Sequence, residues 1–110
     1  MSRPHQPTQR TRLPNRRPGI ALEFEHAGHR YRMHLGYYRG GVIGEVFLDS
    51  TKQNSSLDAF AADAAILISL LLQHGASPAE IGHALRRSPN GTAASLVGAA
   101  VDLLADEEAQ

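Results

Sequence analysis

The sequence predicts an α+β domain in which a three-stranded antiparallel sheet packs on a central hydrophobic helix, with two further short helices outside it. Two observations carry this prediction. Stretches between residues 20 and 49 alternate apolar and polar side chains with the period of two expected of strands. Residues 59–72 are apolar on nearly every side of a helix, and a sharply marked second helix start follows them. A length of 110 residues suits one domain.

Charge is unevenly distributed along the chain. Residues 1–18 hold five arginines and no acid, which leaves six basic and eleven acidic residues in the remainder. The same stretch contains four prolines and a single large apolar residue, Leu13, so it offers little surface to bury. We therefore expect a disordered basic arm at residues 1–12, one folded domain at 13–106 and an acidic tail at 107–110.

Composition also restricts the chemistry. The absence of cysteine excludes disulfides, thiolate metal sites and sulfur nucleophiles. The N-terminus lacks the apolar segment of a secretory signal. The longest strictly apolar run is interrupted by Ser69 and is too short for a bilayer span. A cytoplasmic protein is expected.

The first predicted hairpin joins strands at residues 20–26 and 29–37 through the two-residue loop Ala27-Gly28. It points Ile20, Leu22 and Phe24 inward. The loop places four pairs opposite one another: Glu25 with Arg30, Phe24 with Tyr31, Glu23 with Arg32 and Leu22 with Met33.

The second predicted hairpin uses Arg39-Gly40 as its loop. It places another four pairs opposite one another: Met33 with Val46, Tyr31 with Leu48, His34 with Glu45 and Arg30 with Asp49. In both hairpins apolar residues meet apolar residues and most charges meet opposite charges, which supports the meander.

The central helix follows a capping box formed by Ser55 and Asp58, and Gly75 ends it. Within residues 59–72 only Asp63 and Ser69 are polar, so the helix should be covered on all sides. We expect the sheet on one side and the later helices on the other, with a homodimer burying any remainder and no cavity left for a reaction.

Two shorter helices are predicted after the central one. Ser77, Pro78 and Glu80 provide an N-cap, a proline at the first position and a glutamate at the third. That helix presents Ile81, Ala84 and Leu85. The third helix, at about residues 93–106, presents a further set of apolar residues: Leu96, Ala99 and Leu103, with Val97, Val101 and Leu104 beside them.

Several motifs occur in a characteristic order. "LPNRRPG" is followed by "GEVFLD", a small polar loop and "AAILISLLLQHGASPAEI". This order resembles the TSCPD domain, found near the C-terminus of cobalamin-dependent (class II) ribonucleotide reductases, over about residues 12–105. The catalytic barrel and the cysteines of that family have no counterpart here. The resemblance therefore implies a stand-alone, non-catalytic appendage without a cofactor, and not an enzyme.

Candidate ligand sites are few. The helix N-terminus preceded by Lys52, Asn54, Ser55 and Ser56 suits an anion such as phosphate, although an ordinary capped loop has the same composition. His26, His29 and His34 lie on the first hairpin, where solvated histidines are a better interpretation than a metal site. We predict no metal. Gly-Xaa-Ser-Xaa-Gly and His-Glu-Xaa-Xaa-His motifs are absent.

Asp63 is an unusual residue in so apolar a helix. It lies either near the surface, meeting arginine or water, or buried and paired with a cation from the "NRR" segment or from a second subunit. The sequence favours the first alternative.

The sequence predicts a binding or assembly module that self-associates or binds another protein. The interaction surface is either the remaining apolar helix surface or the charged outer face of the sheet: Glu23, Glu25, Arg30, Arg32, His34 and Glu45. The alternative is nucleic-acid binding through an arm of arginines: Arg10, Arg12, Arg16 and Arg17. That arm could instead dock on the acidic body. A nucleotide or phosphate sensor is suggested by analogy alone.

Overall fold

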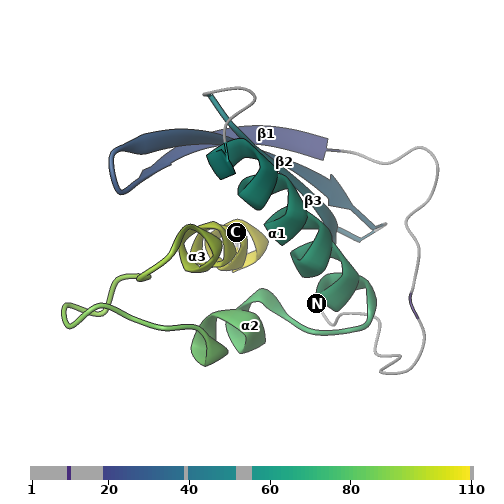
Figure 1. The fold of residues 1–110 in the computed structure, drawn as a ribbon. Coiled ribbons are helices and arrows are strands. Elements are labelled where there is room, and N and C mark those ends of the chain that lie inside the picture. Colours follow the sequence, from purple (N-terminus) through teal and green to yellow (C-terminus); the bar gives the residue numbers. More distant parts are fainter. Residues whose placement is uncertain (1–9, 11–18, 39, 52–55, 110) are drawn as a thin grey trace.

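The computed structural model describes residues 10, 19–38, 40–51 and 56–109. Its elements, in chain order, are β1 (Gly19–His26), β2 (His29–Tyr37), β3 (Ile43–Ser50), α1 (Ser56–Gln73), α2 (Pro78–Ala84) and α3 (Leu96–Ala109). The strands form one antiparallel sheet in the order β1-β2-β3. Figure 1 shows α1 and α3 below the curved sheet and α2 on the far side of α3. The predicted α+β class and meander are confirmed.

The first hairpin has the predicted register. All four expected pairs, including Phe24 with Tyr31, lie opposite one another. Ala27 and Gly28 form the loop with φ values of 52° and 81°, the two positive values that a type I′ turn requires. The Phe24 and Tyr31 rings stack with centroids 5.5 Å apart. Ile20 was expected to point into the core, but it remains 41% exposed at the outer end of β1.

The predicted register of the second hairpin is wrong by two residues. Met33 lies opposite Leu48, and His34 lies opposite Phe47 and not Glu45. The connection is longer than two residues: the Tyr38 amide donates to the Val42 carbonyl at 2.8 Å, and the pairing shifts after Gly36. A shift of two residues returns each side chain to the same face of the sheet. The predicted inward and outward directions of the side chains are therefore unaffected by the wrong register. Arg32, and not Arg30, therefore faces Asp49.

The long helix α1 lies along the free edge of β3. Its side chains bond to backbone groups of β3 that point away from β2: Ser69 Oγ accepts from the Val46 amide at 2.9 Å and donates to the Val46 carbonyl at 3.0 Å. Gln73 Nε2 donates to the Gly44 carbonyl at 3.0 Å. Small residues on the same side of α1, Ala61, Ala64 and Ala65, are buried and allow this close approach. The helix thus covers an edge that could otherwise pair with another strand.

The core lies between the sheet, α1 and α3. Its largest fully buried side chains include Tyr31, Met33, Ile68, Leu72 and Leu104. The predicted core side of α3 is largely confirmed, because Leu96, Val101 and Leu104 are buried and Val97 and Leu103 pack against the core. The prediction was wrong at one position, since Ala100 is buried and Ala99 is half-buried. The third helix also begins and ends three residues later than expected, so residues 107–109 belong to it, and Glu108 Oε2 accepts from the Ile43 amide at 3.1 Å.

The second helix has the predicted capping box. Ser77 Oγ accepts from the Glu80 amide at 3.0 Å, and Glu80 accepts from the Ser77 amide at 3.1 Å. Ile81 and Leu85 pack against the core as expected. Ala84 is exposed, contrary to the prediction, because Gly82 occupies the buried side of this seven-residue helix.

An ion pair joins the segment after α2 to α3. Arg87 contacts both carboxylate oxygens of Asp102, with Nη2 to Oδ1 at 2.7 Å, and also donates to the Gly82 carbonyl at 3.2 Å. The hydrogen bond from Arg87 lowers the pKa of Asp102 below its ordinary value of 3.8, against the opposing effect of burial. The pair is half-exposed, so solvent screening keeps its contribution small.

This ion pair should make stability depend on acid pH. Because the folded-state pKa of Asp102 is lowered, its contribution is complete above the pKa of the unfolded carboxyl and disappears as the pH falls through the folded value. We expect Asp102→Asn to be less stable than wild type at pH 7, and the difference to shrink below about pH 4. Thermal unfolding of both proteins from pH 7 to pH 2.5 measures it. A difference independent of pH would contradict the assignment.

Candidate functional site: an apolar face on α1

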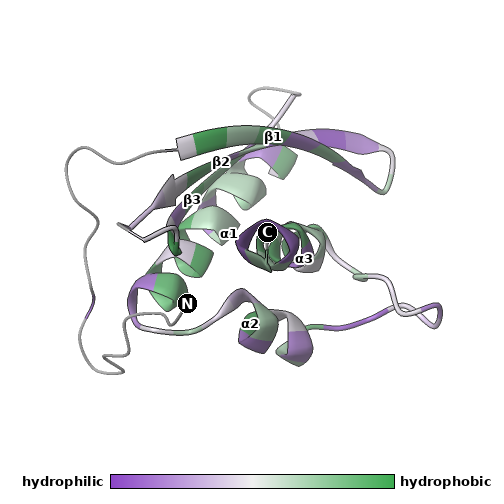
Figure 2. Cartoon of the chain, turned by 180° about the vertical axis from the view of Figure 1, so that it is seen from behind, coloured by the Kyte–Doolittle hydropathy of each residue, from purple (hydrophilic) through white to green (hydrophobic). Residues whose placement is uncertain are grey.

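One side of α1 is apolar and faces solvent. Figure 2 shows hydrophobic residues over most of the length of this helix. The exposed members, here called the apolar face, are Phe60 (54% exposed), Ile66 (56%), Leu67 (63%), Leu70 (36%) and Leu71 (47%). Within a single chain the sheet and the later helices therefore leave one side of α1 uncovered, which is the remainder that a homodimer was expected to bury. Taking about 200 Å² for a fully exposed large side chain, this face leaves roughly 500 Å² of apolar surface in water. Patches of that size on single chains are often functional.

By length and composition alone, α1 is also apolar enough to cross a membrane. The uninterrupted apolar run ends at Ser69, but the whole helix, with its few polar residues included, meets the length and composition criterion. The core helix of a folded domain meets the same criterion. Here the hydrogen bonds from Ser69 and Gln73 to β3, together with the buried Ile68 and Leu72, show a helix packed into a domain.

Asp63 lies at the centre of the apolar face. On a helix its neighbours are Ala59 and Phe60 one turn before it and Ile66 and Leu67 one turn after it, and all four are exposed. Asp63 itself is exposed, as the sequence favoured. Any apolar partner that covered this face would remove the carboxylate from water, which is costly without a cation.

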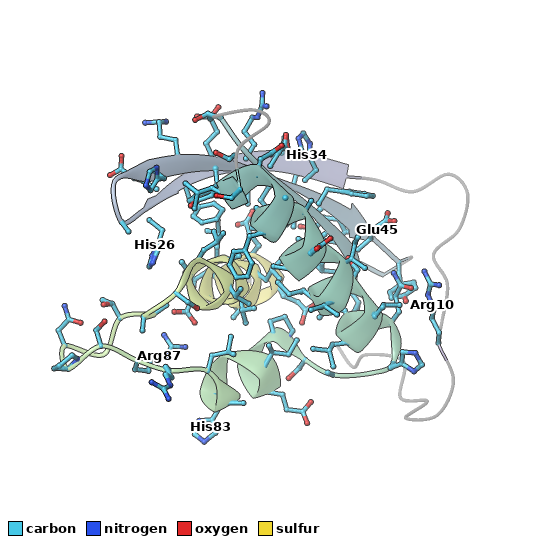
Figure 3. All side chains as sticks on the ribbon, viewed as in Figure 1. Arg10, His26, His34, Glu45, His83 and Arg87 are labelled. Carbon is cyan, nitrogen blue, oxygen red and sulfur yellow. The ribbon has the colours of Figure 1, made fainter. Side chains whose placement is uncertain are left out.

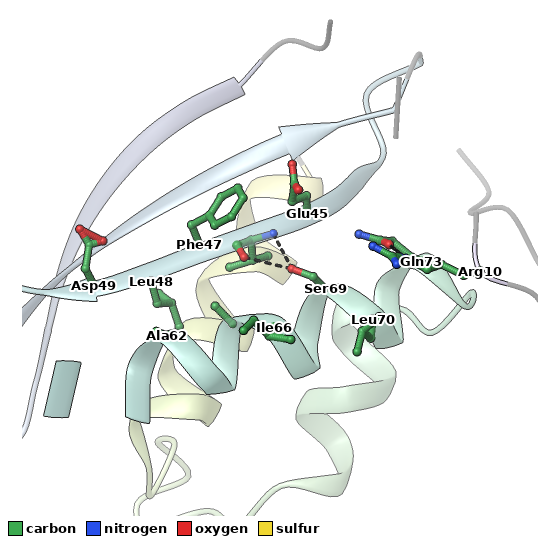
Figure 4. A pocket seen from close by; sticks show the side chains of 12 residues that line it. Arg10, Glu45, Phe47, Leu48, Asp49, Ala62, Ile66, Ser69, Leu70 and Gln73 are labelled. Carbon is green, nitrogen blue, oxygen red and sulfur yellow. Dashed lines mark hydrogen bonds between the residues drawn. The ribbon is translucent and has the colours of Figure 1, made fainter. Parts of the chain in front are cut away.

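A groove separates the apolar face from β3. It has a volume of about 390 Å³ and runs between the outer side of β3 and α1. Figure 4 shows Phe47 on one wall, Ile66 and Leu70 on the other, and Arg10 beside Gln73 at one end. Arg10 Nε donates to Gln73 Oε1, which holds this arginine against the C-terminal end of α1. The expectation that the domain leaves no cavity is therefore corrected by this groove. The groove is open and is lined mainly by apolar side chains.

The charged outer face of the sheet lies on the side away from the core. Its residues pair with one another: Arg30 contacts Glu23 at 2.9 Å, and Arg32 contacts Asp49 at 3.2 Å. Figure 3 shows His34 on the outer side of the sheet, and Glu45 alternates with the buried residues of β3 on the same side as Phe47. Glu25 is exposed opposite Arg30. This face therefore satisfies much of its charge internally.

The remaining predicted site residues are only partly described. Ser56 is exposed in the first turn of α1, whereas Lys52, Asn54 and Ser55 lie outside the described residues. Asp58 in the same turn accepts from the Ser50 amide at 3.0 Å, which places a negative charge near the proposed anion site. Of the arginine arm, Arg10 is described, and Arg12, Arg16 and Arg17 lie outside the described residues.

Histidines form no metal site within the described part of the chain. His26 and His29 lie opposite each other beside the turn, and His34 lies farther along β2. No group of three or more histidine or carboxylate side chains among the described residues is placed to hold a metal ion.

Phe47 and Gln73 are features that the sequence analysis missed. Phe47 is 54% exposed on the outer face of β3, and its position between Glu45 and Asp49 in an alternating strand already indicates that orientation. Gln73 is only 3% exposed and connects Arg10 to the sheet through α1. No pattern in the sequence reveals that contact, because it joins residues far apart in the chain.

Comparison with known proteins identifies the family. The model of the TSCPD domain matches residues 5–107. This chain belongs to the TSCPD domain family. The resemblance seen in the sequence is thereby confirmed. No solved structure matches this TSCPD chain.

Relatives of this TSCPD domain include vitamin B12-dependent ribonucleotide reductases. The reductase of Bradyrhizobium diazoefficiens is 36% identical over 67 residues, and that of Agrobacterium fabrum is 39% identical over 67 residues. Each match covers 61% of this chain and 5% of the reductase. The reductase of Streptantibioticus cattleyicolor is 39% identical over 66 residues, which are 60% of this chain and 11% of the reductase. The chain thus spans a small part of the length of these relatives.

Proposed function

We propose that this TSCPD domain is a non-catalytic accessory module that acts in binding or assembly, and that it self-associates through the apolar face of α1. The observation that carries the proposal is the exposure of five large apolar side chains along one side of a single helix. Burial of such surface is the main driving force of protein association. The roughly 500 Å² of the face, extended by Phe47 and the rim of the groove, approaches the 800 Å² or so that each partner contributes to a standard interface.

The non-catalytic role is supported by composition and by the extent of the family match. The chain contains no cysteine, so it has no thiol for radical or disulfide chemistry. It corresponds to a small segment of the reductases that it resembles. The groove contains Arg10, Glu45 and Asp49 at its rim, but its walls are apolar, which suits binding better than acid–base catalysis.

The apolar face is preferred over the charged sheet face as the contact surface. The ion pairs of Arg30 with Glu23 and Arg32 with Asp49 would have to be desolvated on docking. The side chains of the apolar face gain from leaving water. A net charge of zero further reduces the repulsion between copies.

Sedimentation of the purified chain tests this function. We expect a concentration-dependent dimer, and we expect Leu67→Lys to weaken it by roughly tenfold or more, because a charge would enter an apolar interface. Leu67 is 63% exposed and lysine favours helices, so the variant should fold normally. His34→Lys, which adds the same charge on the sheet face, is the matched control and should leave association unchanged. A wild-type chain that stays monomeric at high micromolar concentration would refute self-association.

A further inference from the structure

We propose that two copies of this chain pair through antiparallel α1 helices around a two-fold axis at Leu67, so that Asp63 of each copy meets Arg10 of the other. This inference rests on the self-association proposed above and specifies its geometry. It also gives the carboxylate at the centre of the apolar face a partner, which a covered face requires.

Within one chain, Asp63 and Arg10 lie too far apart to pair. Arg10 is held at Gln73, ten residues along α1 from Asp63. At 1.5 Å per residue, this separation is about 15 Å along the helix. An arginine held at Gln73 therefore cannot neutralise the Asp63 of its own chain. The contact with Gln73 uses the Nε–H donor, and the guanidinium has four further N–H groups.

The position of the charges along α1 favours one direction of helix pairing. In a parallel pair around a two-fold axis, each residue faces its own copy, so Asp63 would meet Asp63. In an antiparallel pair centred on Leu67, a residue four positions before the centre lies level with the residue four positions after it. Asp63 then lies level with Leu71 of the other copy. Gln73 of that copy, which holds its Arg10, is two residues beyond Leu71, or about 3 Å along the helix. Charge complementarity therefore favours the antiparallel arrangement.

The groove side of α1 carries Arg10 in both copies. Arg10 borders the groove between β3 and α1, next to Leu70. A two-fold axis perpendicular to the plane of two antiparallel helices keeps the groove side of one copy beside the groove side of the other. Asp63 and the Arg10 of the other copy can therefore meet on one side of the interface. Leu67 lies at its centre in both copies.

Single-cysteine variants test the geometry, because the natural chain has no cysteine. We expect Leu67→Cys to form a disulfide-linked dimer under mild oxidation, since the two copies of this position meet at the axis. Phe60→Cys is the control, because residue 60 lies two turns before Leu67 on the same side of α1 and is 54% exposed. In the antiparallel pair its two copies would lie fourteen residues apart, about 21 Å along the helix, and should not link. A parallel pair would link both variants, and this result would overturn the proposal.

Charge removal tests the cross-copy contact. We expect Asp63→Asn and Arg10→Gln each to weaken the dimer, and their effects to be non-additive in the double variant because both remove the same contact. Additive effects of the two substitutions would overturn the contact. A monomeric wild-type chain would instead refute self-association itself, so the two failures are distinguishable by the sedimentation of the unmodified protein.

Discussion

Ser69→Ala is expected to lower the free energy of unfolding by about 2 to 4 kcal/mol, because it leaves two backbone groups without a partner at a buried edge. Ser69 Oγ accepts from the amide of Val46 at 2.9 Å and donates to its carbonyl at 3.0 Å. Both groups point away from β2, and Val46 is only 1% exposed. Alanine supplies neither a donor nor an acceptor, so the edge of β3 would lose its central attachment to α1.

Chemical denaturation of the variant and wild type measures this loss. Ser56→Ala, at the exposed first turn of the same helix, is the matched control, and we expect it to stay within about 0.5 kcal/mol of wild type. The Ser69 variant should also aggregate more readily, since an uncovered strand edge can pair with other chains. Equal stabilities of the two variants would show that the bonds between Ser69 and Val46 contribute nothing.

Two adjacent leucines of α1 should behave in opposite ways. Leu72 is 1% exposed and lies in the core, whereas Leu71 is 47% exposed on the apolar face. We expect Leu72→Ala to lower the free energy of unfolding by about 2 to 5 kcal/mol, because it leaves a cavity. Leu71→Ala should change the stability of the monomer by about 0.5 kcal/mol or less.

The same two substitutions should affect dimerisation in the opposite order. Leu71→Ala removes a large side chain from the proposed interface and should weaken the dimer, whereas Leu72 does not reach that surface. Unfolding is measured at a protein concentration low enough to keep the chain monomeric, since dimerisation adds to apparent stability. Sedimentation is measured at high concentration. Equal destabilisation by both substitutions would mean that α1 is covered on both sides within one chain.

The register of the two hairpins shows where sequence reasoning succeeded and where it failed. The loop at Ala27-Gly28 has two residues, and a two-residue loop leaves one choice of partner for each strand residue. Gly40 and Gly41 both have positive φ in a longer connection, and several lengths of such a loop fit the same alternating strands. Only the folded chain distinguishes them.

The candidate site was predicted in part. The exposed position of Asp63 and the possibility of an uncovered helix surface both followed from the composition of residues 59–72. The contact of Arg10 with Gln73 and the groove beside Phe47 did not, since each joins segments that are not adjacent in the chain. Such contacts depend on how the helix lies relative to the sheet.

The sequence by itself determined the types of the elements, the first hairpin and the cap of α2, because each is encoded by residues close together in the chain. The order of several motifs along the chain indicated the family. The tertiary structure alone decided that α1 lies along the edge of β3 and which of its sides meets solvent. In an amphipathic helix the periodicity of the apolar residues indicates which side is buried. A helix that is apolar all round has no such signal. Ser69 and Gln73 determine which side of α1 is buried, because their polar side chains form hydrogen bonds with the backbone of β3.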